Sequence, residues 1–339
     1  MNKTNRMAAL LFSLLAVVML LPTTAFAAGS IDLNRDVNLT ISYLDDTTPL
    51  SEAQFDIYLV ATVDECGELT TTELFQKFHV DIRGKNDEAW RTLASTLEGY
   101  VLRDKVAATD SSKTDNKGLV SFPTAGNRLT PGLYLVLGHR HFQGSRRYDA
   151  SPFMVILPGL DRDANDWIYE VIANAKHDSK PIPDGPNDTI TRKVLKVWKD
   201  DGHEKERPTE VIVQLLRDGD IYDTVVLNAQ NNWRHTWRNL DDRYQWTVAE
   251  KRLEDYIVEV AREGITFVIT NTYAEDISDE PTPISPATPP TTPDEPTTPN
   301  KPTLPQTGQL WWPVPVLLAV GLLFIIIGLI RRKGIPDEK

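Results

Sequence analysis

The sequence predicts an all-β protein with two tandem antiparallel β-sandwiches, the first of which carries a helical insert. Short runs that alternate apolar and polar residues, separated by turn residues, fill most of positions 28–274. Prolines and a glycine gather at 181–188 and divide this part into two stretches of domain size. A segment that begins at Asn86 has the spacing of a helix instead.

The first sandwich is expected at 28–180. Its helix should begin after Asn86, whose side chain suits an N-cap, because apolar residues then recur three or four positions apart. These residues are Trp90, Leu93, Leu97 and Val101. Strands are expected at 39–44, 53–63, 118–122, 131–139, 151–158 and 167–176, each apolar and bounded by turn residues.

The second sandwich is expected at 189–274. A first strand at 194–198 is followed by a strand that ends in a turn at Asp218-Gly219. Two further strands are expected within 223–240, another at 244–250 and the last at 265–273.

The N-terminal segment 1–27 has the parts of a secretory signal. Lys3 and Arg6 precede a short apolar run, and small residues at Ala25 and Ala27 form a cleavage site after position 27. The apolar run is short for a membrane span, so we expect an exported chain.

The C-terminal part has a different composition. Residues 275–303 are rich in proline and threonine, cannot build a core and predict an extended stalk. Positions 309–339 contain an apolar run long enough to cross a bilayer, which is followed by a basic tail. The pentapeptide "LPQTG" at 304–308 separates these two segments.

Composition excludes several functions. A net charge of −12 argues against binding to nucleic acid. Cys66 is the only cysteine, so an intrachain disulfide cannot form. No phosphate loop, metal-ligand spacing or nucleophile–base set indicates turnover on an external substrate, so neither an enzyme nor a cofactor is expected.

The C-terminal arrangement resembles the cell-wall sorting signal of Gram-positive surface proteins, with Leu304, Pro305, Thr307 and Gly308 at its fixed positions. The resemblance implies that a sortase cleaves after Thr307 and joins its carboxyl group to peptidoglycan or to an amine of another pilin. The membrane helix would then be temporary, and the mature protein would be secreted and anchored to the cell wall.

Residues 189–274 resemble the Cna B-type domain, an immunoglobulin-like sandwich, through "KVW", "RPTEVIVQLLRDG", "VVLNAQNNW", "WTVAE" and "FVITNTY". The resemblance implies a self-formed isopeptide bond between Lys196 and Asn271, promoted by Glu250. Strand alternation supports it, since each of the three shares a face with apolar neighbours. The alternative is an exposed lysine with a salt-bridge partner and a turn asparagine. Lys193 and Lys199 would replace Lys196 only if the strand register shifted, because both lie on the opposite face of the strand.

The first sandwich looks like the N-terminal domain of Gram-positive pilins in the order of "TDNKGLVSFPTAGNRLTPGLYLV", "SPFMVILP" and "WIYEVIANAK". This places Lys176 at the lysine that accepts the next subunit, although Ala175 stands where that family has proline; Lys180 is the alternative. Tyr43 occupies a position where related domains often have an isopeptide lysine, so no internal bond is predicted there.

Together these features predict a wall-anchored pilus subunit, either basal or ancillary or a short backbone pilin. Its partners would be a sortase, peptidoglycan and other pilin subunits. The alternative is a monomeric wall-anchored adhesin whose first domain binds a host matrix protein or glycan. The only chemistry expected of the chain itself is a single turnover that forms the internal bond.

Overall fold

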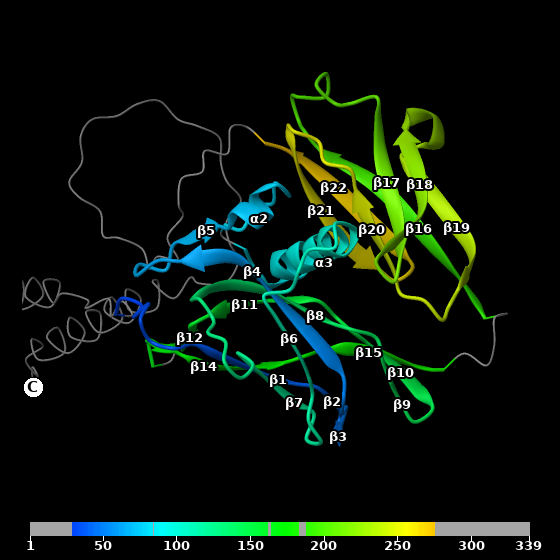
Figure 1. Ribbon diagram of the computed structural model, residues 1–339. Helices are drawn as coiled ribbons and strands as arrows, with labels where there is room; N and C mark the ends of the chain where they lie inside the picture. The colour runs from blue at the N-terminus through cyan, green and yellow to red at the C-terminus, as the bar shows by residue number, and fades with distance from the viewer. Residues whose placement is uncertain (1–28, 84, 162–163, 183–187, 275–339) are drawn as a thin grey trace, which may run out of the picture. The chain divides into compact units, whose positions relative to one another are not determined.

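The computed structural model describes residues 29–83, 85–161, 164–182 and 188–274 (Figure 1), all of which belong to one contact unit, Met1–Thr288. The predicted signal, with Ala25 and Ala27, lies outside the described residues. So do the stalk at 275–303, the sorting motif Leu304–Gly308, the apolar segment at 309–339 and most of the predicted linker. None of the helices within the described ranges is both long and apolar enough to span a membrane.

The first sandwich consists of two main sheets, with strands in the orders β14-β1-β7 and β11-β8-β4-β5, and β6 adds to β4. A smaller sheet has the order β15-β10-β9, and β2-β3 and β12-β13 form short pairs. The bounds are β1 Asn38–Ser42, β2 Leu44–Asp45, β3 Thr48–Pro49, β4 Gln54–Val63, β5 Leu69–Thr71, β6 Asp110–Lys113, β7 Leu119–Phe122, β8 Gly132–Gly138, β9 His141–Gln143, β10 Arg146–Ala150, β11 Phe153–Leu157, β12 Gly159–Asp161, β13 Asp166–Ile168, β14 Glu170–Asn174 and β15 His177–Pro181.

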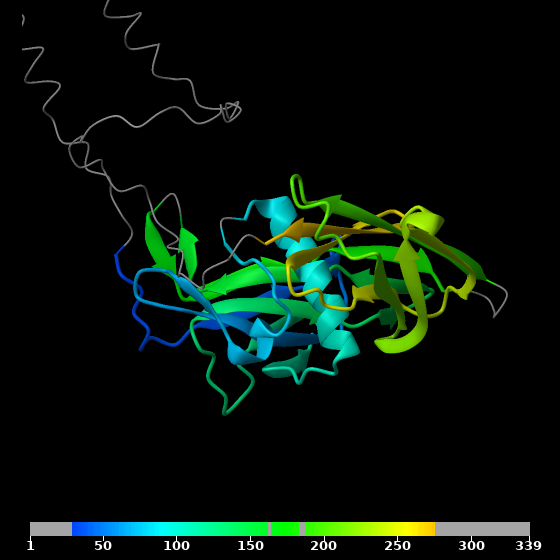
Figure 2. The same cartoon turned by 90° about the horizontal axis from the view of Figure 1, so that it is seen from above.

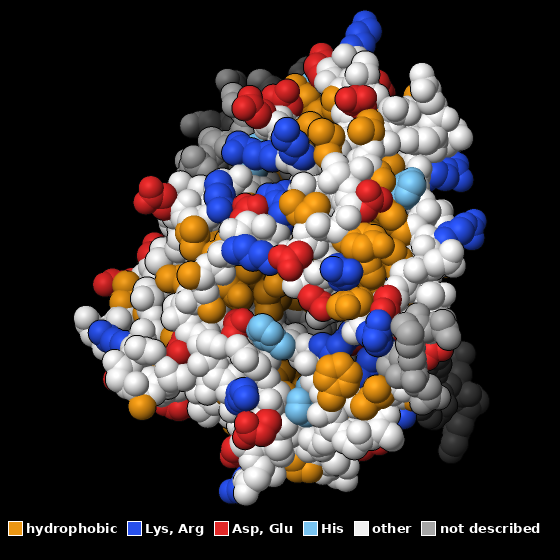
Figure 3. Space-filling model, turned by 45° about the vertical axis from the view of Figure 1, so that its right-hand side comes forward, with side chains coloured by type: hydrophobic (Ala, Val, Ile, Leu, Met, Phe, Trp, Pro, Cys, Tyr) orange, Lys and Arg blue, Asp and Glu red, His pale blue; other side chains and the backbone are white. Residues whose placement is uncertain are grey.

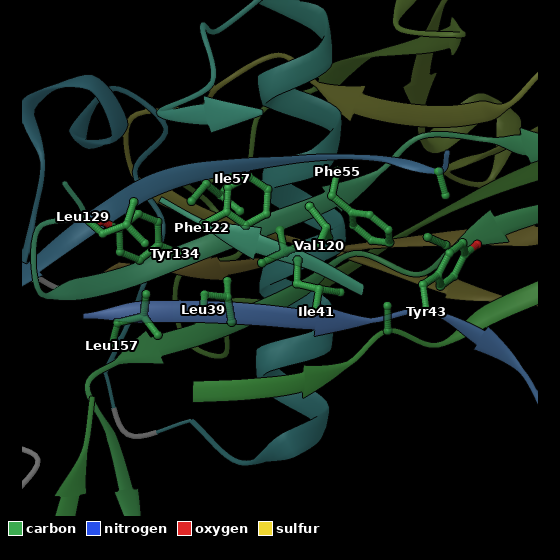
Figure 4. Packing of buried hydrophobic residues seen from close by; sticks show 14 of the residues in the cluster. Leu39, Ile41, Tyr43, Phe55, Ile57, Val120, Phe122, Leu129, Tyr134 and Leu157 are labelled. Atoms are coloured by element: carbon green, nitrogen blue, oxygen red, sulfur yellow. The ribbon is translucent and has the colours of Figure 1, made fainter. Parts of the chain in front are cut away.

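The core of the first sandwich lies between its two main sheets. Leu39 and Ile41 of β1 face Phe55 and Ile57 of β4, and all four are fully buried (Figure 4). Their spacing of two residues is the sequence pattern that predicted these strands. Burying such side chains supplies the main free energy for closing the sandwich, on the order of 2 kcal/mol for each large one.

Two helices cover the outer face of the sheet that contains β4 and β8: α2 (Glu73–Gln76) and α3 (Asp87–Arg103). The side chain of Asn86 accepts a hydrogen bond from Ala89 N at 2.9 Å, which confirms the predicted N-cap. Because α3 lies on the outside and the core lies on the inside, Leu133, Leu135 and Leu137 of β8 are as buried as the residues between them.

The second sandwich has sheets in the orders β19-β16-β22-β21 and β18-β17-β20. The bounds are β16 Thr189–Lys199, β17 Glu210–Arg217, β18 Asp220–Asn228, β19 Arg234–Asp241, β20 Trp246–Glu250, β21 Tyr256–Glu263 and β22 Thr266–Tyr273, with a 3-10 turn at Ala229–Asn231. Asp218 and Gly219 both have positive φ, as a two-residue type I′ hairpin requires, which confirms the predicted turn.

The structure corrects four expectations. The sheets are not wholly antiparallel, because β1 pairs with β14, and β16 with β22, in parallel. The predicted strand at 167–176 is interrupted at Tyr169, which is buried and divides β13 from β14. Strand β15 extends to Pro181, where the predicted linker begins, and β21 was not predicted although Tyr256, Val258 and Val260 alternate.

Figure 2, from above, shows α3 running between strands of the two sandwiches. On the face in Figure 3, cationic and anionic side chains are intermingled with apolar ones. That face therefore offers mixed charge to a partner.

Candidate functional site

Lys196 lies inside the second sandwich. Along β16, Arg192, Val194 and Lys196 are buried, whereas Lys193 and Lys199 are exposed. The alternation that directs Val194 and Trp198 toward the core therefore directs Lys196 inward as well. A lysine in this position must lose most of its hydration, which is costly unless it gains specific partners.

Glu250 and Asn271 approach Lys196 from two other strands. Glu250 is the last residue of β20, in the opposite sheet, where it pairs with Val213. Asn271 lies in β22, which runs parallel to β16, and pairs with Trp198. Both residues have no exposed surface. The structure thus brings the three predicted residues together, and none of them is on the surface or in a turn.

The distances join the three side chains through the carboxyl group. Asn271 Nδ2 donates a hydrogen bond to Glu250 Oε1 at 2.6 Å, and Lys196 Nζ lies 3.6 Å from Glu250 Oε2. Two buried oxygens, Glu250 Oε2 and Asn271 Oδ1, have no hydrogen-bond partner. Buried polar atoms are rarely left in this state in a folded protein, so the cluster is poorly satisfied as a purely structural contact.

Aromatic rings close one end of the cluster. Lys196 Nζ lies 4.4 Å from the centre of the Trp198 ring and also donates to Ile269 O at 3.4 Å. The Trp198 ring meets Trp233 and Tyr256 edge to face, each at 5.2 Å between ring centres. These rings shield the amine from water while leaving it without a strong ionic partner.

Burial shifts the ionisation of both titratable groups toward their neutral forms. It lowers the pKa of Lys196 to about 8, against the opposing effect of Glu250. It also raises the pKa of Glu250, although Lys196 and Asn271 act in the other direction. Burial therefore shifts Lys196 toward the free amine and Glu250 toward the protonated acid, which are the forms needed for nucleophilic attack and acid catalysis.

This arrangement holds a nucleophile, an amide electrophile and a proton carrier without requiring a cofactor. Within the described residues, no group of three or more histidine, cysteine or acidic side chains is placed to hold a metal ion. Rotation of the Asn271 amide by about 180° would present Oδ1 in place of Nδ2 to a protonated Glu250, which could then donate to it.

Lys176, the predicted acceptor, is exposed between β14 and β15. Its backbone is fixed because Lys176 O accepts a hydrogen bond from Ser151 N at 2.8 Å, and the preceding Ala175 is buried and donates to Ser42 O. The alternative, Lys180, is also exposed but lies within β15, paired with Arg147. Both amines are thus on the surface, and Lys176 alone lies between strands.

Tyr43 occupies the corresponding internal position of the first sandwich. Its ring is fully buried and packs edge to face on Phe55 and His177, and its hydroxyl has no partner. Burial raises the pKa of this phenol, so it stays protonated. A neutral phenol is not an amine nucleophile, and that no internal bond forms at this position stays a prediction.

One contact to the cluster was not predicted. Arg103, at the end of α3 in the first sandwich, donates from Nη1 to Glu250 O at 3.2 Å. Arginine at the end of a helix is common, and no local pattern in the sequence indicates which distant strand it meets. The contact becomes visible only when the two sandwiches are folded together.

Comparisons with known proteins match the second sandwich. The family model described as Cna protein B-type domain matches residues 192–272. The collagen adhesin of Staphylococcus aureus is 35% identical over 110 residues, which are 29% of this chain and 9% of the adhesin. The chain therefore matches less than a tenth of that relative's length.

Several solved structures are similar at low identity. A single B repeat unit of the collagen-binding surface protein of Staphylococcus aureus is 16% identical, with a TM-score of 0.24 over 70% of this chain and 98% of the repeat. The shaft pilin SpaA of Lactobacillus rhamnosus GG is 14% identical, with a TM-score of 0.24 over 72% and 100%. The major pilin SpaA of Corynebacterium diphtheriae is 12% identical, with a TM-score of 0.26 over 70% and 98%.

The family model covers the strands that carry Lys196, Glu250 and Asn271. The second sandwich of this chain is a Cna B-type domain.

Proposed function

We propose that this chain is a wall-anchored pilus subunit whose second sandwich joins its own first and last strands by an amide bond between Lys196 and Asn271. One observation carries the proposal: Lys196, Glu250 and Asn271 meet in a dry core, 3.6 Å and 2.6 Å apart through the carboxyl group of Glu250.

The reaction needs no external reagent. The neutral amine of Lys196 attacks Cγ of Asn271, and protonated Glu250 polarises the amide oxygen. The carboxyl group then takes a proton from the attacking nitrogen and passes it to Nδ2. A Cγ–Nζ bond forms, the Cγ–Nδ2 bond breaks, and ammonia leaves. The chain is used once and is not a catalyst for other molecules.

The pilus role rests on features at both ends of the chain. The export signal and the LPQTG motif support attachment through Thr307 to peptidoglycan by a sortase, and exposed Lys176 supports the joining of a second subunit. The domain shared with a collagen adhesin supports a protein of the cell surface. A monomeric adhesin would need the same anchor but no acceptor lysine.

Mass spectrometry tests the internal bond. We expect a branched tryptic peptide that contains Lys196 and Asn271 and is about 17 Da lighter than its two linear parts, the mass of the ammonia released on amide formation. Glu250→Gln should remove this peptide, because a glutamine cannot shuttle the proton.

Glu254→Gln is the matched control, since Glu254 is exposed in the loop before β21. It should leave the branched peptide unchanged. Recovery of only linear peptides from the unchanged protein would contradict the internal bond.

Extraction of cell walls tests the assembly. We expect wall extracts boiled in detergent to contain species far heavier than the 38.2 kDa chain. Thr307→Ala should move the protein to membrane and medium, whereas Thr303→Ala, four residues earlier, should not. Lys176→Ala should remove the heavy species and keep the anchor. A single wall-linked species that this change does not alter would favour the adhesin.

A further inference from the structure

The second sandwich has an open side next to Glu250. Strand β20 ends the order β18-β17-β20 and β21 ends the order β19-β16-β22-β21, so each has one edge without a neighbouring described strand. The two strands adjoin and are linked by residues 251–255. An uncovered edge here would expose backbone groups to water within reach of the buried cluster.

Helix α3 of the first sandwich lies along this open side. Val260 N donates a hydrogen bond to Thr96 Oγ1 at 2.8 Å in a buried position, so a helix hydroxyl satisfies an edge amide of β21. Thr96 Oγ1 in turn donates to Thr92 O at 2.7 Å. Its hydroxyl therefore acts as donor and acceptor at once, which fixes its orientation.

Gly99 allows the helix to come close to β20. A Cβ atom at Gly99 would lie 2.3 Å from Val248 O and 3.6 Å from the side chain of Ala249. Real side chains do not approach a carbonyl oxygen so closely, so only glycine permits this contact. The backbone of α3 consequently rests directly on the strand that ends in Glu250.

Arg103 completes the contact one turn further along the helix. Its Nη1 donates to Glu250 O, its Nε donates to Asp104 Oδ1 at 2.7 Å, and its guanidinium lies 5.0 Å from the centre of the Tyr100 ring. The side chain is only 17% exposed, so these three contacts hold it in one position. Arg103 thereby fixes the backbone of Glu250 from outside the second sandwich.

We infer that α3 is part of the cross-linking centre of the second sandwich. Arg103 is a positioning residue that holds the backbone of Glu250, and the helix excludes water from the open side. The inference rests on the proposed internal bond. It means that the first sandwich is needed for the second to react efficiently, beyond any role in pilus assembly.

The reaction depends on α3 because it requires that water be excluded from the cluster of Lys196, Glu250 and Asn271. Water that enters along β20 would stabilise the charged forms of Lys196 and Glu250, and charged lysine is not a nucleophile. A free end of β20 would also let the carboxyl group move away from Asn271. Both effects slow the reaction without changing any of the three reacting residues.

The test follows bond formation over time in newly synthesised full-length chain, by the ratio of branched to linear peptides. We expect Arg103→Ala to slow formation about ten-fold, the change produced by one pKa unit in the balance of neutral and charged forms. Arg103→Lys should recover most of the rate, since lysine keeps a cationic donor there. Thr96→Val, which removes the acceptor for Val260 N, should also slow it.

Lys105→Ala is the matched control. Lys105 also reaches the second sandwich, through Asp220 Oδ1 at 2.7 Å, but it does not touch β20. Its loss should not alter the rate. To separate positioning from simple loss of stability, Arg103→Ala is also made in the Glu250→Gln background, in which no bond should form. The melting temperature of this double variant should differ from that of Glu250→Gln by no more than roughly 2 °C.

The outcomes separate the two proposals. If the unchanged chain forms the bond and Arg103→Ala and Thr96→Val form it equally fast, the role of α3 is overturned and the bond stands. If Lys105→Ala slows it as much as Arg103→Ala, the helix acts only through general stability and the inference is again overturned. If the unchanged chain forms no bond, both proposals fail.

Discussion

Lys196 and Glu250 are buried although both side chains are charged in water. Removing two charges from water costs several kcal/mol for each, and their attraction offsets this only when the geometry is good. Here the distance between Nζ and Oε2 is 3.6 Å, longer than a strong ionic hydrogen bond, and Oε2 has no partner. As an ion pair this cluster is therefore poorly satisfied, and the amide bond that we propose would replace both charges with a neutral group.

A second buried charge near the site is paired well. Asp200, which follows β16, accepts hydrogen bonds from Arg207 Nη2 at 2.6 Å and Nε at 2.8 Å, and Tyr256 Oη lies 3.3 Å away. Arg207 lowers the pKa of Asp200 through these bonds. This pair fixes the loop between β16 and β17 beside the aromatic rings that cover Lys196.

We predict that Arg207→Ala lowers the free energy of unfolding by about 1–3 kcal/mol at pH 7, because the buried carboxylate of Asp200 loses both hydrogen bonds from the guanidinium and keeps only that from Tyr256 Oη. A carboxyl group with a lowered pKa stabilises the fold above its unfolded value, and that contribution is lost as pH falls through the folded value. The difference between variant and parent should therefore shrink below about pH 4.

Urea unfolding at a series of pH values measures this difference. Lys205→Ala removes an exposed cation from the same loop and should have little effect at any pH. A constant difference between Arg207→Ala and the parent down to pH 2 would show that the ion pair is not its source.

The burial of the three cluster residues could be predicted because each inward orientation follows from one strand, whereas their grouping follows from the resemblance to the Cna B-type domain. Alternation with Val194 turns Lys196 inward, and the same argument applies to Glu250 beside Val248 and to Asn271 beside Ile269. Arg103 could not be predicted in this way. Its role depends on a carbonyl group 147 positions later in the chain, and residue type alone does not identify such a partner.

At the scale of elements, α3 links two cores. Leu93 and Leu97 pack toward the sheet of β8 and β11, and the adjacent face of the helix meets Ala249 of the second sandwich. Helical spacing predicted this element and its apolar face. It did not predict the contact of α3 with the second sandwich. Thr96, Gly99 and Arg103 make that contact, and residues of these types are equally common on helix faces exposed to solvent.

The cap of α3 offers a test of how far the helix supports the whole unit. We predict that Asn86→Ala lowers the free energy of unfolding by about 1 kcal/mol, because the amide of Ala89 loses its acceptor. For a unit of this size the melting temperature should fall by roughly 2–4 °C.

Calorimetry measures this change, with Asn86→Ser as the control because serine also caps helices. Equal melting temperatures for Asn86→Ala and the parent would mean that the first turn of α3 contributes nothing to the folded unit.

Strand β21 and the break between β13 and β14 are two features that the sequence analysis did not predict. β21 was not predicted, although it has a clear alternating pattern in Tyr256, Val258 and Val260 and only two residues separate it from β22. The interruption of β13 and β14 at Tyr169 has a tertiary origin, since Tyr169 Oη accepts a hydrogen bond from Asp32 N at 2.8 Å. Propensity along the chain carries no information about that bond.

At the scale of the whole molecule, the parallel pairing of first and last strands sets how force passes through the chain. In the second sandwich β16 and β22 lie side by side and run in the same direction, in register from Lys193 with Thr266 to Lys199 with Thr272. Tension that enters at one end of the domain and leaves at the other would shear this ladder of hydrogen bonds. A covalent link within the same strand pair would carry the load instead.

We predict that pulling on single molecules will show no unfolding step for the cross-linked second sandwich. In Asn271→Ala the loop between positions 196 and 271 is free, so an added extension is expected of about 75 residues at roughly 3.6 Å each, or about 270 Å. Asn232→Ala, in the turn before β19, keeps the reacting side chains and serves as the control. The first sandwich should unfold in all three proteins, because Tyr43, which directly follows β1 of the parallel pair β1 and β14, stands where a lysine would be needed. Reductant should change none of these steps, since the chain has a single cysteine. A 270 Å step in the unchanged protein would show that Lys196 and Asn271 are not joined and that hydrogen bonds alone hold the domain.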